Sequence, residues 1–153
     1  MSKHKRPSSY GSLIECFVDG AARGQGAVEE DSNRGDGAAA VLIYQNHKLI
    51  GQYARGLGRR TNNEAEYEAV LLALILCWAA NLKDPIIYSD STVVVNQINE
   101  KWICKSKELQ SLLASVKEIE EEFRFRLVHV KRSYVAEADR LANQMLDKLE
   151  SRI

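Results

Sequence analysis

The sequence predicts an α/β fold, in which helices flank a sheet with an antiparallel edge. Two observations support this prediction. Three apolar segments with strand character come first, separated by turns and loops, and this order favours an antiparallel meander. Helical segments then alternate with two further strand segments, which right-handed crossovers would place as parallel neighbours of the first strand.

The first strand is predicted at residues 13–18, where near-continuous apolarity indicates a central position covered on both faces. It is expected to end at Asp19-Gly20, which places Asp19 at the carboxyl end of the strand. Residues 21–37 are rich in glycine and charge and predict an exposed loop. The remaining strands are predicted at residues 38–44, 48–55, 85–89 and 125–131.

The central helix is predicted to start at Thr61, because Thr61 and Glu64 have the spacing of a capping box. Glu66 lies on the same helical stripe as Val70 and Cys77. Its carboxylate is therefore expected to face the core, where it needs a partner. The helices are predicted over residues 61–81, 92–99, 108–122 and 135–150.

Length and composition indicate a globular protein. The 153 residues are 45% hydrophobic and 27% charged, which favours one globular domain over a disordered or fibrous chain. We expect residues 1–11 to form a flexible basic tail and residues 12–153 to form a single domain. Lysine plus arginine equals aspartate plus glutamate, 21 against 21, so any nucleic-acid partner must be held by local charge.

The three cysteines and the lengths of the apolar segments indicate the cellular compartment in which the protein is expected. Cys16, Cys77 and Cys104 lack metal-binding spacing and are interpreted as reduced thiols. The longest apolar run, residues 69–80, is too short to span a membrane, and the N-terminus lacks the apolar region of a signal peptide. A cytoplasmic protein without a membrane partner is expected.

Four acidic residues are expected to converge. Asp19 follows the first strand, Asp90 follows the fourth, Glu66 lies in the helix above them and Asp139 lies early in the last helix. Four carboxylates repel one another unless cations neutralise them, and oxygen ligands suit magnesium or manganese. Two such ions can promote in-line displacement at a phosphodiester. The pattern therefore favours metal-dependent phosphodiester hydrolysis.

Each acid also has a purely structural explanation. Asp19 fits a turn, Asp90 fits a helix cap and Glu66 fits the first turn of a helix, where the dipole favours negative charge. Asp139 can pair with Arg140. The joint arrangement favours the catalytic interpretation, because one sheet would bring all four together.

The four acids lie in four short motifs, which are residues 17–24 (FVDGAARG), 61–67 (TNNEAEY), 88–91 (YSDS) and 138–143 (ADRLAN). Together, and in this order, they resemble the motifs of ribonuclease H of type 1. The chain is most similar to the short subgroup that lacks a histidine-containing loop before the last helix. The resemblance implies a ribonuclease H-like fold, with a five-stranded mixed sheet of a three-strand antiparallel meander plus two parallel strands.

The resemblance also implies an activity. The expected reaction is endonucleolytic hydrolysis of the RNA strand of RNA/DNA hybrids by a two-metal-ion mechanism, leaving 5'-phosphate and 3'-hydroxyl ends. By matched position, Asp19 would bridge two Mg²⁺ ions, Glu66 and Asp90 would complete one site and Asp139 would hold the other. Mn²⁺ is the alternative ion. A monomer without a small-molecule cofactor is expected.

Matched positions also imply substrate contacts. Asn62 and Asn63 would read the minor groove of the hybrid, and Thr61 would contact a phosphate of the DNA strand. A basic segment over residues 101–107, between the second and third predicted helices, resembles a reduced form of the family's basic protrusion, and its alternative interpretation is a solvated basic turn. The expected substrate-binding residues are Gly20, Gln25, Thr61, Asn62, Asn63, Trp102, Lys105 and Lys107.

Three departures from the family pattern keep alternatives open. Residues 24–27 read Gly-Gln-Gly-Ala in place of Gly-Asn-Pro-Gly, and a charged extension over residues 28–36 follows. Residues 132–135 contain no histidine. Val135 replaces an asparagine that commonly caps the last helix, so Ser133 is expected as the cap. The alternatives are a non-catalytic hybrid- or RNA-binding module and a nuclease of the same fold that acts on another duplex.

Overall fold

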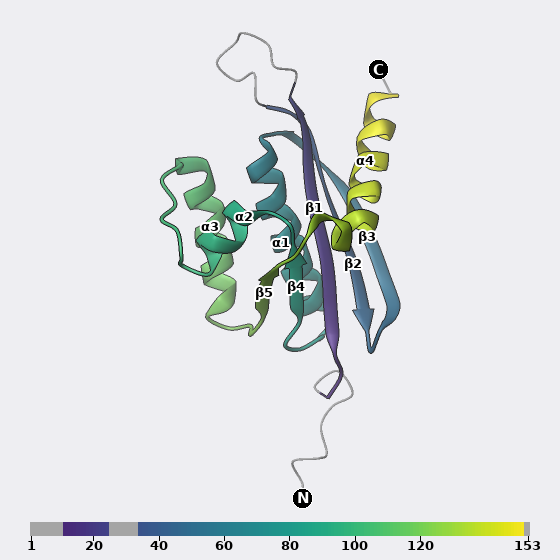
Figure 1. Ribbon diagram of the computed structural model, residues 1–153, viewed down its shortest axis with the longest axis vertical. Coiled ribbons are helices and arrows are strands. Elements are labelled where there is room, and N and C mark those ends of the chain that lie inside the picture. The colour runs from purple at the N-terminus through teal and green to yellow at the C-terminus, as the bar shows by residue number, and fades with distance from the viewer. Residues whose placement is uncertain (1–10, 25–33, 152–153) are drawn as a thin grey trace, which may run out of the picture.

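The computed structural model describes residues 11–24 and 34–151, and they form a five-stranded mixed sheet with helices on both faces (Figure 1). The strand order is β3-β2-β1-β4-β5. β1, β2 and β3 are antiparallel neighbours, whereas β4 runs parallel to β1 and β5 parallel to β4. This architecture confirms the predicted fold class. The strands are β1 (Ile14–Gly24), β2 (Gly35–Gln45), β3 (Lys48–Arg60), β4 (Ile86–Ser89) and β5 (Arg126–His129).

The helices divide between the two faces of the sheet. α1, α2 and α3 lie on one side of the sheet and α4 lies on the other (Figure 1). α1 covers the central strands, and α4 packs mainly on β2 and β1. The helices are α1 (Asn62–Ala79), α2 (Thr92–Ile98), α3 (Lys107–Glu120) and α4 (Ala136–Glu150).

The first hairpin is longer than predicted. β1 pairs with β2 from Ile14 opposite Gln45 to Gly24 opposite Gly35, so the prediction of a loop over residues 21–37 was wrong at both ends. Backbone pairing needs no large apolar side chains, and the small residues of β2 pack beneath α4. Residues 25–33 lie outside the described residues, and so does most of the charged extension.

Asp19 lies within β1 and not at its end, which corrects the prediction. The parallel pairing of β1 with β4 nevertheless stops early, because the last paired residues are Phe17 and Tyr88. Asp19 therefore still lies beyond the carboxyl end of the parallel part of the sheet. This is the edge at which ligands of open α/β sheets bind.

Two apolar clusters hold the sheet between its helices. On the α1 side, Cys16 of β1 lies 3.4 Å from Cys77 of α1 (Sγ to Sγ), and both are buried free thiols. On the α4 side, four of the six buried core residues are alanines, which allow the helix to lie close to the sheet. This part of the core contains Ala38, Ala40, Leu42, Ala138, Ala142 and Leu146.

Other boundaries differ by a few residues. β3 continues to Arg60 because β2 offers it a paired edge. α4 begins at Ala136, after a single 3-10 turn over Arg132–Val135, and its cap residue Val135 makes no side-chain hydrogen bond. The expectation that Ser133 caps this helix was therefore wrong. Among the described residues, no helix is both long enough and apolar enough to cross a membrane.

Candidate active site

β1 and α1 approach each other closely at Gly20. A Cβ atom on Gly20 would lie only 2.1 Å from the carbonyl oxygen of Ala65, so only glycine fits there. The backbone N–H of Gly20 donates a hydrogen bond of 3.0 Å to Oε1 of Glu66. The strand thus fixes the Glu66 carboxylate beside Asp19. The Asp19-Gly20 pair does not form a turn.

The four predicted acids converge on one pocket. Carboxylate oxygens of Asp19, Glu66 and Asp90 all lie within 4.8 Å of one another. Asp139 of α4 borders the same pocket, whose volume is about 240 Å³. Its lining residues are Asp19, Gly20, Ala21, Asn62, Asn63, Glu66, Asp90, Ser91, Arg132 and Asp139.

Asp90 has a polar atom without a partner. Ser91 caps α2 by accepting a hydrogen bond from the backbone N–H of Val94, so Asp90 is not needed as the cap. Oδ1 of Asp90 is buried and has no hydrogen-bond partner among the described residues. A buried carboxylate oxygen without a donor is costly. Its position beside two other carboxylates fits a cation as the missing partner.

The ionised forms of two carboxyl groups in the pocket are disfavoured in the absence of a cation. Burial raises the pKa of Asp19 to about 9, with further contributions from the charge of Glu66 and a hydrogen bond to Asp139. Burial also raises the pKa of Glu66 to about 8, and the charge of Asp90 adds to the increase. The Gly20 N–H and the Arg132 charge oppose it. A divalent cation would relieve the same repulsion and favour the ionised carboxylates.

Asp139 is held by a chain of polar contacts. Nδ2 of Asn143 donates to Oδ1 of Asp139 at 3.2 Å and to its carbonyl oxygen at 3.0 Å. Nη2 of Arg23 in β1 donates to Oδ1 of Asn143 at 3.1 Å, and Nη1 lies 2.9 Å from Asp147. Arg23 therefore fixes α4, and with it Asp139, against β1. The sequence motifs contain Arg23 and Asn143, but spacing alone did not indicate this role.

Arg132 is a site residue that the sequence interpretation missed. It lies in the 3-10 turn before α4, borders the acidic pocket and lowers the pKa of Glu66 against the larger effect of burial. The sequence contained one indication of this role. Arg132 is a positively charged residue in the segment where the resemblance led us to look for a histidine.

The expected substrate-binding residues fall into two groups. Gly20, Asn62 and Asn63 line the pocket, and Thr61 caps α1 beside it. Oδ1 of Asn62 accepts a hydrogen bond of 2.8 Å from the backbone N–H of Ala22, which leaves its amide N–H groups to face a ligand. The structure does not bring the second group, Trp102, Lys105 and Lys107, into the pocket, and all three are exposed at or before the start of α3. Gln25 lies outside the described residues.

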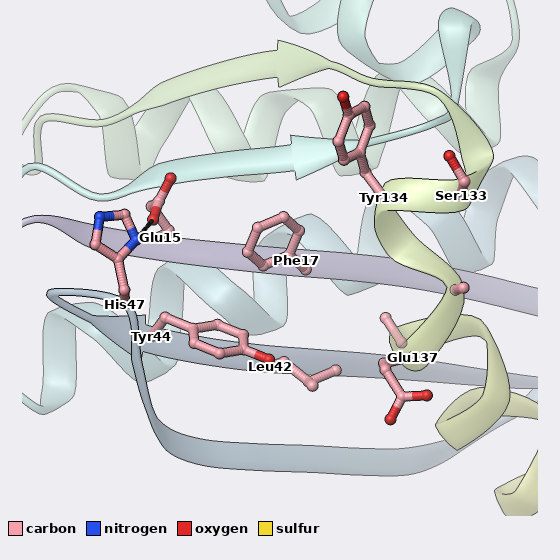
Figure 2. Close-up of a pocket in the computed structure, with 10 residues that line it drawn as sticks. Glu15, Phe17, Leu42, Tyr44, His47, Ser133, Tyr134 and Glu137 are labelled. Carbon is pink, nitrogen blue, oxygen red and sulfur yellow. Dashed lines mark ion pairs between the residues drawn. The ribbon is translucent and has the colours of Figure 1, made fainter.

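A second pocket lies on the α4 side of the sheet (Figure 2). Its volume is about 280 Å³, and Phe17 and Tyr44 form part of its wall. Glu15 at one end accepts a hydrogen bond of 2.7 Å from the hydroxyl of Tyr88 and lies 3.6 Å from Nδ1 of His47. None of the residues predicted for the site lines this second pocket.

Comparisons with known proteins agree with this geometry. A family model described as reverse transcriptase-like matches residues 23–145. The chain is 30% identical over 139 residues to ribonuclease HI of Halobacterium salinarum, covering 90% of this chain and 66% of that protein. It is 32% identical over 154 residues to a ribonuclease H of Clostridium botulinum, covering 88% of this chain and 96% of that protein.

Solved structures give the same result. Ribonuclease H1 of Halobacterium salinarum superposes with a TM-score of 0.80 at 28% identity, covering 89% of this chain and 98% of that one. LC11-RNase H1, solved in complex with an RNA/DNA hybrid, gives 0.78 at 28% identity with the same coverage. The mixed sheet with its acidic pocket defines a protein of the ribonuclease H fold. The matches to these relatives and structures define the family. This chain belongs to the ribonuclease H family, type 1.

Proposed function

We propose that this protein is a divalent-metal-dependent endoribonuclease that hydrolyses the RNA strand of RNA/DNA hybrids. One observation carries the proposal: Asp19, Glu66 and Asp90 present carboxylate oxygens within 4.8 Å of one another, and Asp139 borders the same pocket. The two relatives described above are a ribonuclease HI and a ribonuclease H, and one similar structure holds an RNA/DNA hybrid. Together they supply the substrate class.

The donor set fits hard divalent cations such as Mg²⁺ or Mn²⁺. All four side chains offer oxygen, and Oδ1 of Asp90 is buried without a hydrogen-bond partner among the described residues. We propose that Asp19, Glu66 and Asp90 would hold one ion and that Asp19 and Asp139 would hold a second. When bound, two such ions activate a water molecule and stabilise the leaving oxygen of a phosphodiester.

The chain itself supplies orientation. The Gly20 N–H holds Glu66, and Asn143, itself held by Arg23, orients Asp139. Arg132 places a positive charge at the pocket, where it offsets the acids and can face a phosphate of the scissile strand.

We propose that Asn62 and Asn63 read the minor groove of the hybrid. Both are exposed residues at the start of α1 and line the pocket beside the acids. Their amide groups can donate to and accept from the 2'-hydroxyl and the base edges that a minor groove displays. Recognition of the RNA strand would then take place next to the site of cleavage.

A substrate panel tests the proposal. The purified protein is incubated with an end-labelled RNA/DNA hybrid, double-stranded RNA and double-stranded DNA, each with Mg²⁺, with Mn²⁺ or with a chelator. We expect metal-dependent internal cleavage of the RNA strand of the hybrid, with 5'-phosphate and 3'-hydroxyl product ends.

The same panel separates the alternatives. Binding of the hybrid without cleavage at any divalent concentration indicates a non-catalytic binding module and contradicts the proposal. Faster cleavage of double-stranded RNA or DNA indicates a nuclease of the same fold with another substrate.

A further inference from the structure

The start of α1 is attached to a distant arginine through a buried carboxylate. Nη1 and Nη2 of Arg34 donate hydrogen bonds to Oε1 and Oε2 of Glu64 at 2.8 and 3.1 Å, a two-point contact. Glu64 is only 7% exposed. Arg34 directly precedes β2 and belongs to the charged extension, for which the family resemblance gave no role.

The same carboxylate closes the capping box of α1. Oε1 of Glu64 accepts a hydrogen bond of 2.9 Å from the backbone N–H of Thr61, and the Thr61 hydroxyl accepts one of 3.1 Å from the N–H of Glu64. Arg34 therefore neutralises the acid that fixes the first helical turn. A capping box alone needs no such partner, since water can solvate an exposed glutamate at this position.

Two contacts thus hold the residues at the start of α1. On one side, Asn62 is hydrogen-bonded to the backbone of Ala22 in β1. On the other side, Glu64 is paired with Arg34, whose carbonyl oxygen in turn accepts a hydrogen bond of 3.5 Å from Arg59 of β3. Asn63 lies between these two contacts. The turn that carries both asparagines is therefore fixed to two strands of the sheet.

Among the described residues, Glu108 also interacts electrostatically with this pair. Glu108 at the start of α3 is fully exposed, and its pKa is lowered first by hydrogen bonds from its own backbone and from Ser106. Arg34 adds a smaller effect, which places Glu108 near the guanidinium. Because Glu108 is exposed, water screens its charge, whereas Glu64 is buried and makes the two-point contact with Arg34.

We propose that Arg34 is a positioning residue for substrate recognition: through Glu64 it holds Asn62 and Asn63 in the orientation that binds the hybrid. This inference rests on the proposed function. Without Arg34, the buried Glu64 carboxylate retains one backbone donor and turns toward water, which loosens the first turn of α1. The asparagines must then be ordered when the hybrid binds, so affinity falls while the carboxylates that carry the chemistry stay in place.

The test uses Arg34→Gln, Glu64→Gln and the double variant. Glutamine at residue 64 keeps the acceptor of the capping box but removes the ion pair, so the fold is preserved. We expect each single variant to raise KM for the hybrid by about fivefold or more, to leave kcat within about twofold and to leave the salt dependence of binding unchanged. The double variant is expected to match the single variants, because both remove the same contact.

A matched control and a rescue sharpen the result. Arg55→Gln removes an exposed arginine from β3 and is expected to leave KM unchanged. Arg34→Lys keeps the charge without the two-point contact and is expected to restore KM only in part. Amide hydrogen exchange at residues 62–66 reports the helix start without substrate, and we expect it to be faster in both single variants.

Three results would overturn the inference. The first is an unchanged KM in Arg34→Gln. The second is additive effects in the double variant. The third is a KM that changes in Arg34→Gln but not in Glu64→Gln, together with a smaller salt dependence of hybrid binding in Arg34→Gln. A slope of log binding constant against log salt concentration that is smaller by about one would indicate direct contact between Arg34 and a phosphate. A wild-type protein that cleaves no hybrid contradicts the proposed function and the substrate role together, whereas the exchange measurement still tests the contact between Arg34 and the helix start.

Discussion

The backbone N–H of Gly20 donates a hydrogen bond of 3.0 Å to the carboxylate of Glu66, and this contact joins β1 to α1 where the acids converge. Glu66 begins an apolar stripe of the helix, so its carboxylate would otherwise lack a donor near the core. The hydrogen bond depends on the closest approach of strand and helix, which only glycine permits. The geometry of the acidic pocket therefore depends on a residue without a side chain.

Replacing Gly20 by alanine tests this dependence. The added Cβ would lie 2.1 Å from the carbonyl oxygen of Ala65, so β1 and α1 must move apart. We expect Gly20→Ala to lower the free energy of unfolding by about 2 kcal/mol or more, measured by urea denaturation. Gly11→Ala is the control, because nothing lies within 4 Å of a Cβ there. Equal stability of the two variants would contradict the predicted clash.

Divalent cations are expected to stabilise the folded protein. Binding of Mg²⁺ or Mn²⁺ at 100 times its Kd would add about 2.7 kcal/mol, and each kcal/mol raises Tm by about 2–4 °C for a chain of this size. Asp90→Asn should lose most of this increase, because it removes a charge beside Asp19 and Glu66. Asp84→Asn is the matched control, because Asp84 has a positive φ of 53° that asparagine also tolerates. An equal Tm increase in both variants would place the cation elsewhere.

The metal-free protein is expected to lose stability as the pH rises. The pKa of Asp19 is raised from 3.8 to about 9 and that of Glu66 from 4.5 to about 8, each mainly by burial. Between those limits the folded state binds more protons than the unfolded state, so the free energy of unfolding decreases with increasing pH. Urea denaturation in a chelator at pH 6 to 9 measures the slope. Asp19→Asn should flatten it, and a wild-type slope near zero would argue against the raised pKa values.

Arg132 is expected to support activity more than stability. It is exposed, yet it borders the acidic pocket and acts on Glu66. We expect Arg132→Gln to reduce kcat for hybrid cleavage by at least about tenfold, because one preorganised cation at a reacting phosphate has an effect of this order or larger. Tm should change by less than about 2 °C. Lys131→Gln, at the adjacent exposed residue, is the control, and equal activity of the two variants would remove Arg132 from the site.

Local patterns predicted the parts of the site that depend on local structure. The capping box of Thr61 and Glu64 was confirmed, because both of its hydrogen bonds join residues three apart. The convergence of Asp19, Glu66 and Asp90 followed from the order of strands and helices, which fixes where strand ends meet.

Long-range contacts were not predictable in this way. The pairing of Arg34 with Glu64 spans 30 residues and leaves no periodic signal in the sequence. The extension of β1 to Gly24 and of β3 to Arg60 was missed because these ends contain several glycines, and that of β1 also two alanines, whose strand propensity is low. Pairing with β2 stabilises these ends despite their composition.

Single-turnover cleavage of one labelled RNA/DNA hybrid by the wild-type protein and by Asp19→Asn, with and without Mg²⁺, tests the central claim most directly. Asparagine has the size of aspartate, so the fold should persist, but it lacks the negative charge of a carboxylate ligand. We predict cleavage of the RNA strand by the wild type only with Mg²⁺, and none by a folded Asp19→Asn protein. Cleavage by Asp19→Asn at the wild-type rate, or wild-type cleavage that persists in a chelator, would contradict the assignment of these acids as a metal-dependent catalytic site.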